Sequence, residues 1–196
     1  MKKNLLLIVL FAFCGIVVAK ADETSDYFKG LVEKMRANFN ASIVAEMEMT
    51  SPDLTLTYHV YRKGVKSRVE TETQGMRTII FSDDMQSTIF IPKMEVLTTQ
   101  VVPEDQAELL LPNEKMFENC KREEKTTKNG YECEMVVCEK GEEFLRLCIS
   151  DKYYMPVYTE TEGLTVEVKN IRQPDLPDSI FAPPIELTDE VPVLTY

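Results

Sequence analysis

Hydrophobic and polar residues alternate along most of the chain, which is the pattern of β-strands with one buried and one exposed face. In residues 42–50 (SIVAEMEMT), Ile43 and Met47 alternate with Val44 and Glu46. Ten further runs follow, most of them separated by glycine, proline or acidic turn residues: LTLTYHVYRK, VKSRVETETQ, MRTIIFSDD, QSTIFIP, EVLTTQVV, KMFENCKREEKTT, YECEMVVCE, EFLRLCIS, PVYTETE and LTVEVKNIR. We therefore predict about eleven short strands in an antiparallel meander.

Two segments have the features of helices instead. Residues 22–39 (DETSDYFKGLVEKMRANF) carry an apolar stripe at helical spacing, and Thr24 or Ser25 can cap the start. The stripe consists of Tyr27, Phe28, Leu31, Val32, Met35 and Phe39. Residues 103–111 (PEDQAELLL) predict a short helix that starts with a proline and two acidic residues and stops at Pro112.

The first 21 residues have the pattern of a secretory signal peptide. Two lysines precede an apolar run, residues 5–18, and the sequence Ala19-Lys20-Ala21 fits a cleavage site before Asp22. The run is short for a membrane-spanning helix, which favours cleavage over a retained anchor. Lipidation of Cys14 is disfavoured because Phe13 stands where a small residue is needed. We predict an exported, periplasmic protein that is not an integral membrane protein after cleavage, with one domain over 22–184 and a tail or extra strand over 185–196.

The charge of the chain excludes some partners. The formal net charge is −11, and cleavage removes three lysines and no acidic residue, which leaves −14. Because an acidic surface repels phosphate backbones, we expect no nucleic-acid partner.

Four cysteines remain after cleavage: Cys120, Cys133, Cys138 and Cys148. Their gaps lack a CxxC pair, so two disulfides are favoured over a zinc site. A three-residue loop at 128–130 would place Cys120 opposite Cys138, and a four-residue loop at 139–142 would place Cys133 opposite Cys148. Both pairs would then occupy non-hydrogen-bonded positions, where side chains approach most closely, so we predict the disulfides Cys120–Cys138 and Cys133–Cys148.

No catalytic motif is present. The chain lacks GxSxG and HExxH, and it has one histidine, His59, in a predicted strand. The acidic pair Asp83-Asp84 fits a turn better than acid–base chemistry. We therefore expect no enzyme activity, no cofactor and no metal site.

Three segments together resemble the LolA-like proteins, which are periplasmic carriers that sort lipoproteins to the outer membrane. These are YRKGVKSRVETETQGMRTIIFSDDMQSTIFIPKMEVL, GYECEMVVCEKGEEFLRLCISDKYYMPVYTETEG and NIRQPDLPDSIFAPP. The resemblance implies a mainly β fold with some α: a single curved antiparallel sheet that forms an unclosed half-barrel, lidded by the N-terminal helix and the short helix. Two disulfides and the absence of tryptophan depart from the lipoprotein carrier itself.

The resemblance also implies a function and a site. It implies a carrier or binding protein for lipid or lipoprotein acyl chains, held in an apolar cavity between sheet and lid, with a lipid or an acylated protein as partner. An envelope sensor or protein-interaction domain of the same fold, with an envelope protein as partner, is the alternative. Arg68 matches the family's arginine that holds the lid closed by hydrogen bonding; the alternative is a surface charge paired with Glu70 or Glu72. Candidate cavity residues are Met47, Met49, Leu56, Tyr58, Ile80 and Phe90, although periodicity leaves open which face of the sheet is concave.

Overall fold

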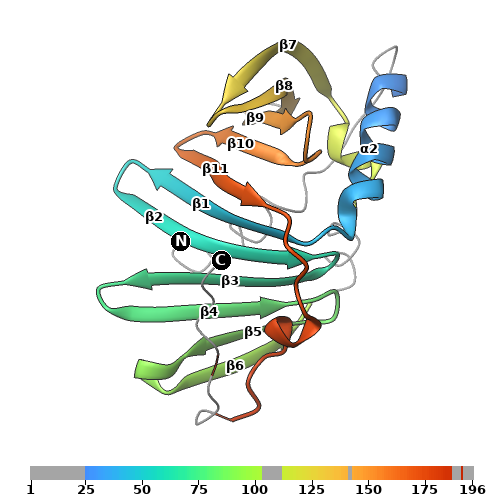
Figure 1. Cartoon of the computed structure of the whole chain (residues 1–196). Helices are drawn as coiled ribbons and strands as arrows, with labels where there is room; N and C mark the ends of the chain where they lie inside the picture. Colours follow the sequence, from blue (N-terminus) through green and yellow to red (C-terminus); the bar gives the residue numbers. More distant parts are fainter. Residues whose placement is uncertain (1–24, 103–111, 141–142, 187–190, 192–196) are drawn as a thin grey trace. The chain divides into compact units, whose positions relative to one another are not determined.

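The computed structural model describes residues 25–102, 112–140, 143–186 and 191. Those residues contain the helix α2 (Ser25–Phe39) and eleven strands (Figure 1). The strands are β1 (Ile43–Ser51), β2 (Leu54–Lys63), β3 (Lys66–Thr73), β4 (Met76–Ser82), β5 (Gln86–Ile91), β6 (Val96–Val101), β7 (Cys120–Lys128), β8 (Tyr131–Lys140), β9 (Glu143–Ser150), β10 (Pro156–Thr161) and β11 (Leu164–Arg172). The predicted signal peptide, the predicted helix at 103–111 and most of the tail at 185–196 lie outside the described residues.

All eleven strands belong to one antiparallel sheet, in the order β6-β5-β4-β3-β2-β1-β11-β10-β9-β8-β7. Strands that are neighbours in sequence are neighbours in the sheet, except that β1 lies beside β11. The order begins at β6 and ends at β7, so the sheet formed by the described strands is unclosed. The predicted meander of about eleven strands is confirmed.

Contacts divide the chain into two compact units. Unit 1 comprises residues 1–39, 48–55 and 109–169, and unit 2 comprises residues 40–47, 56–108 and 170–196. Each unit has a core of its own.

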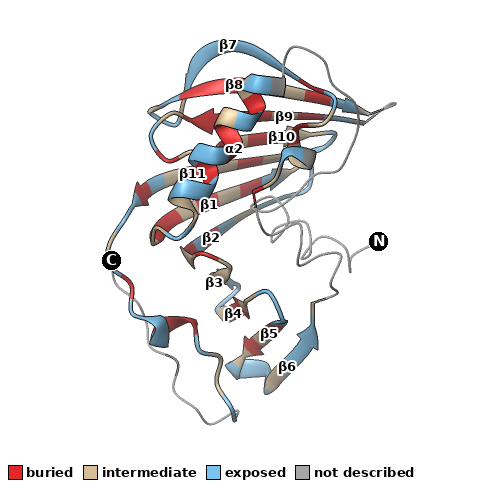
Figure 2. Cartoon of the chain, turned by 90° about the vertical axis from the view of Figure 1, so that its right-hand side faces the viewer, coloured by how far each residue is buried: buried red, intermediate tan, exposed pale blue. Residues whose placement is uncertain are grey.

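The core of unit 1 lies between α2 and strands of the sheet (Figure 2). The helical spacing of Phe28, Leu31, Val32 and Met35 turns these side chains to one side, and all four are buried. They pack against side chains from β7, β8, β9 and a short 3₁₀ helix at Glu114–Phe117, namely Phe117, Cys120, Val136, Cys138, Leu145, Leu147 and Ile149. The apolar stripe predicted from the sequence is therefore the packing face of this helix.

The disulfide Cys120–Cys138 is present, and Cys120 lies opposite Cys138. The adjacent backbone bond from the N–H of Glu139 to the carbonyl of Asn119 makes Cys120–Cys138 a non-hydrogen-bonded pair, as expected. The predicted three-residue loop is wrong, because residues 129 and 130 form a two-residue turn. Both have positive φ (53° and 81°), which an asparagine and a glycine adopt readily. A β-bulge between Arg122 and Lys125 shifts the pairing, so the cysteines still meet.

The second disulfide, Cys133–Cys148, is also present, but in a different register from the predicted one. Cys133 lies opposite Ser150, and Cys148 lies opposite Met135, because Lys140 pairs with Glu143. The predicted four-residue loop and direct opposition are therefore wrong. A shift of two residues keeps each side chain on its face, so the cysteines bond diagonally with their Cα atoms 5.4 Å apart. The two disulfides together use Cys120, Cys133, Cys138 and Cys148.

The core of unit 2 includes the segment that follows β11. Leu176, Ile180 and Phe181 pack on Val44 of β1 and Tyr61 of β2. Ile180 and Phe181 belong to a 3₁₀ helix at Asp178–Phe181. A second cluster joins Ile79, Phe81 and Phe90, with Leu97 and Val191 against it. The prolines at 174, 177, 183 and 184 limit this region to extended and 3₁₀ backbone.

Candidate ligand-binding face

The apolar face of unit 2 is defined here by Met47, Tyr58, Val60, Val69 and Ile80. Val60 pairs with Val69, and Val69 pairs with Ile80, so these three side chains share a face across β2, β3 and β4. Tyr58 is two residues from Val60 in β2 and lies on the same face. Val44 packs with Tyr61 on the opposite face. Because side chains alternate along a strand, Met47, three residues after Val44 in β1, points to the apolar face.

The six predicted cavity residues do not all lie on that face. Met47, Tyr58 and Ile80 are members of it, and Leu56 follows the same alternation in β2. Phe90 pairs with Ile79, so its side chain is on the opposite face from Ile80. Met49 is two residues beyond Met47 in β1 and belongs to unit 1. The structure therefore brings together four of the six residues.

The chemistry of the apolar face is that of a hydrocarbon surface. All five side chains are buried, and the one polar atom among them is the Tyr58 hydroxyl. Burial raises the pKa of the Tyr58 phenol above its ordinary value of 10.0, so the group stays neutral at physiological pH. Methionine adapts its shape to irregular apolar partners, which suits Met47 to this surface. A ligand here would be held by burial of apolar area.

Arg68 lies on the opposite face of unit 2 and is fully buried. Its Nη2 is 2.7 Å from Oε1 of Glu70, and its Nη1 donates a 3.3 Å hydrogen bond to the carbonyl of Ile180. The guanidinium also lies over the rings of Tyr61 and Phe81, 5.9 and 5.5 Å from their centroids. Burial lowers the pKa of Arg68, while Glu70 acts in the opposite direction. In unit 2 this arginine therefore ties strand β3 to the segment after β11.

Two lysines attach the same segment through Asp178. Lys66 and Lys63 form ion pairs with the two carboxylate oxygens, at 2.7 and 3.0 Å, and Lys63 also donates to the carbonyl of Leu176. The hydrogen bonds from Lys66 and Lys63 lower the pKa of Asp178 to about 2. With Arg68, these contacts fix residues 176–181 on β2 and β3.

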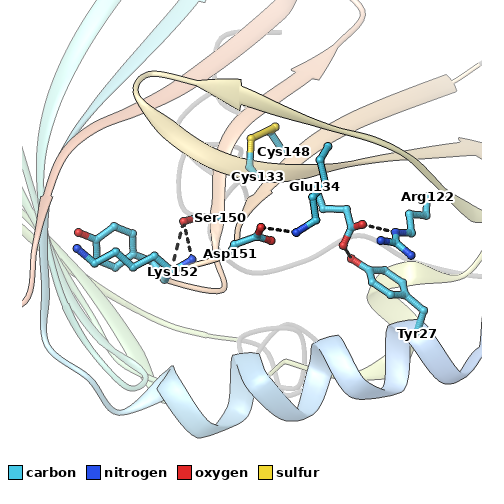
Figure 3. A network of polar contacts seen from close by, with 10 residues as sticks. Tyr27, Arg122, Cys133, Glu134, Cys148, Ser150, Asp151 and Lys152 are labelled. Carbon is cyan, nitrogen blue, oxygen red and sulfur yellow. Dashed lines mark hydrogen bonds and ion pairs between the residues drawn. A yellow bond between two sulfur atoms is a disulfide. The ribbon is translucent and has the colours of Figure 1, made fainter.

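Unit 1 contains a polar cluster that the sequence did not predict (Figure 3). Tyr27 of α2 donates a hydrogen bond to Glu134 of β8, which also forms an ion pair with Arg122 of β7. Arg122 lies over the Tyr27 ring, 4.7 Å from its centroid. Burial, and then the bond to Glu134, raise the pKa of Tyr27. The available signal was that Glu134 shares the alternation of the apolar residues Val136 and Cys138.

Comparisons with known proteins identify the fold. An uncharacterised conserved protein from Thermus thermophilus superposes with a TM-score of 0.59 at 14% identity, over 83% of this chain and 96% of that one. MucB superposes with a TM-score of 0.57 at 9% identity, over 85% of this chain and 65% of MucB. The complex of Pseudomonas aeruginosa MucA and MucB gives 0.55 at 13% identity, over 80% of this chain and 59% of that one.

These superpositions show the fold alone, because the sequence identities are low. The chain spans about three fifths of the length of the MucB chains. Neither protein-family models nor curated protein sequences give a match. The predicted LolA-like fold is confirmed. In the described part of the chain, no helix is long and apolar enough to cross a membrane.

Proposed function

We propose that this chain is an exported, periplasmic binding protein that takes an acyl chain, or another apolar group of similar shape, on the apolar face of unit 2. The observation that carries the proposal is the row of apolar side chains that follows one face across β1 to β4, with Met47, Tyr58, Val69 and Ile80 among its members. The fold of the chain and the signal-peptide pattern of residues 1–21 are consistent with this proposal.

Burial alone accounts for useful affinity at such a face. Each methylene that leaves water contributes about 0.8 kcal/mol, so an acyl chain with ten buried methylenes gains roughly 8 kcal/mol before the cost of association. Because the apolar side chains are buried without ligand, a guest must displace the atoms that cover them. We therefore expect slow uptake and little selectivity between chains of similar length.

The test is a substitution at the partly exposed end of the face. Leu56→Glu introduces a carboxylate where the acyl chain would lie, and we expect binding of a fluorescent C16 fatty acid to weaken at least tenfold, because an unpaired charge resists desolvation. Thr57→Glu is the matched control, since Thr57 is exposed and its side chain points to the other face of β2. Equal loss in both variants, or none in either, would contradict the proposal.

A second function has a specific observation in its favour. MucB is a fold relative of this chain and forms a complex with MucA. By analogy of fold alone, the chain would then be an envelope protein-interaction or sensor domain without a transport role. The two functions are separable, because a carrier retains lipid or acylated peptide when it is purified from the periplasm without detergent, whereas an interaction domain is purified empty.

A further inference from the structure

Among the described strands, β6 has a neighbour on one side only. It is the last strand in the sheet order, with β5 as its neighbour. The N–H of Val102 donates to the carbonyl of Met85 at 2.9 Å, which makes Val102 and Met85 a hydrogen-bonded pair. Because such pairs alternate along an antiparallel ladder, Thr98 and Gln100 bond to β5, whereas Leu97, Thr99 and Val101 direct their N–H and C=O groups away from it.

The two ends of the sheet differ in how they resist pairing. Strand β7 carries five consecutive charged residues, 121–125, and a bulge between Arg122 and Lys125. Charges and bulges are the usual features that prevent an edge strand from pairing with another chain. Strand β6 (VLTTQV) has neither feature, and its residues from Thr98 to Val101 are exposed, with Val101 at 81%. Of the two strands that end the described sheet, β7 thus has features that resist pairing and β6 has none.

The charges around β6 indicate which kind of partner could pair with this strand. Glu95 immediately precedes the strand, and Asp83 and Asp84 lie in the turn beside Met85, at the other end of β6. The whole chain has a net charge of −11, so two copies repel each other. A pair of six-residue strands is also far short of the roughly 20 residues per partner in a stable interface. Both points disfavour a second copy of this chain.

We propose that β6 is a docking edge for an extended segment of a different protein, which adds a strand beyond Val96–Val101. The segment has β-branched residues that match the uncharged strand, and basic residues at its ends that meet Glu95 and the pair Asp83-Asp84. Main-chain hydrogen bonds to Leu97, Thr99 and Val101 supply the affinity, and the flanking charges supply the selectivity. This edge is independent of the apolar face, so it does not rest on acyl-chain binding.

The test uses two fluorescein-labelled peptides, Lys-Val-Thr-Val-Thr-Val-Lys and its counterpart with glutamate in place of both lysines. Fluorescence anisotropy at low salt is expected to show saturable binding of the lysine peptide, and binding at least tenfold weaker for the glutamate peptide. Val101→Pro removes one outward N–H at a position where an edge strand tolerates proline, and is expected to weaken binding about fivefold to tenfold. Val101→Ala keeps the N–H and should change binding less than twofold.

Two readouts make the result decisive. The urea midpoint of Val101→Pro should equal that of the wild type, which shows that the variant is folded whether or not the protein binds an acyl chain. Where the wild type takes up the C16 fatty acid, Val101→Pro should take it up equally, which separates this proposal from the acyl-chain one. Equal binding of the lysine peptide by both Val101 variants would overturn the docking edge, as would the absence of binding at about 1 mM peptide. A dimer in sedimentation that Val101→Pro dissociates would overturn the choice of partner.

Discussion

Replacing Arg68 by methionine removes a buried guanidinium and keeps a long apolar side chain between the rings of Tyr61 and Phe81. The variant loses the 2.7 Å ion pair with Glu70 and the hydrogen bond to the carbonyl of Ile180. Breaking a buried pair by removing one partner costs about 3–5 kcal/mol.

The carboxylate of Glu70 keeps a second partner when Arg68 is replaced. Both Nε and Nη2 of Arg77 bond to its Oε2, at 3.1 and 2.8 Å. This retained pairing places the expected loss at the lower end of the range, about 3 kcal/mol in the free energy of unfolding by urea. Arg77→Met is the matched control, because Arg77 is partly exposed and is expected to cost about 1 kcal/mol.

The location of the effect matters as much as its size. Hydrogen–deuterium exchange should increase at residues 176–181, whose attachment to β3 includes Arg68, and should stay unchanged in α2. A loss below about 1 kcal/mol would refute the importance of the ion pair. Increased exchange in α2 with none at 176–181 would refute the attachment and would support the lid role that the LolA-like resemblance implies for this arginine.

Three other predictions concern separate contacts. Asp178→Asn should lower the free energy of unfolding at pH 7, because the pKa of the wild-type carboxyl is lowered from 3.8 to about 2 and its charged form stabilises the fold. The difference between the two proteins should disappear as the pH falls from about 4 to about 2, where the wild-type carboxylate becomes protonated, and a difference that persists at pH 2 would contradict this reasoning. Tyr27→Phe should cost about 1–2 kcal/mol through loss of the bond to Glu134. Because the pKa of Tyr27 is raised in the folded protein, the phenol of the unfolded chain ionises first, above about pH 10, and the cost of Tyr27→Phe should shrink there. Urea titrations from about pH 7 to about pH 11 measure this cost, and a cost that stays constant would contradict the prediction. Replacing Cys133 and Cys148 together by alanine should cost about 3 kcal/mol, or about 6–12 °C in Tm by calorimetry, and an unchanged Tm would be inconsistent with the bond.

The strands were predictable because local alternation reflects burial on one face of a sheet. The disulfide Cys120–Cys138 was also predicted, although through a loop length that is wrong. The true turn is one residue shorter, and a bulge near Arg122 compensates for the difference. A bulge leaves no clear mark in the sequence, because it depends on how two strands meet.

The site was harder to predict because it depends on long-range register. Ile80 and Phe90 each have the alternation of a buried strand residue, yet the β4–β5 register places them on opposite faces. Arg68 bonds to Ile180, 112 residues away, and no local pattern indicates that contact. The partners of Glu134 could have been predicted in kind, because an acidic residue at a buried position of an alternating strand requires polar or charged partners.

The measurement that tests acyl-chain binding most directly is mass spectrometry of molecules extracted from the protein, purified from the periplasm without detergent. The same sample gives the mass of the intact chain, which should correspond to a start at Asp22. The proposed function predicts about one lipid or acylated peptide per chain, and markedly less in Leu56→Glu than in Thr57→Glu. An empty wild-type protein that also fails to take up a fluorescent C16 fatty acid would contradict the proposal and favour the protein-interaction function.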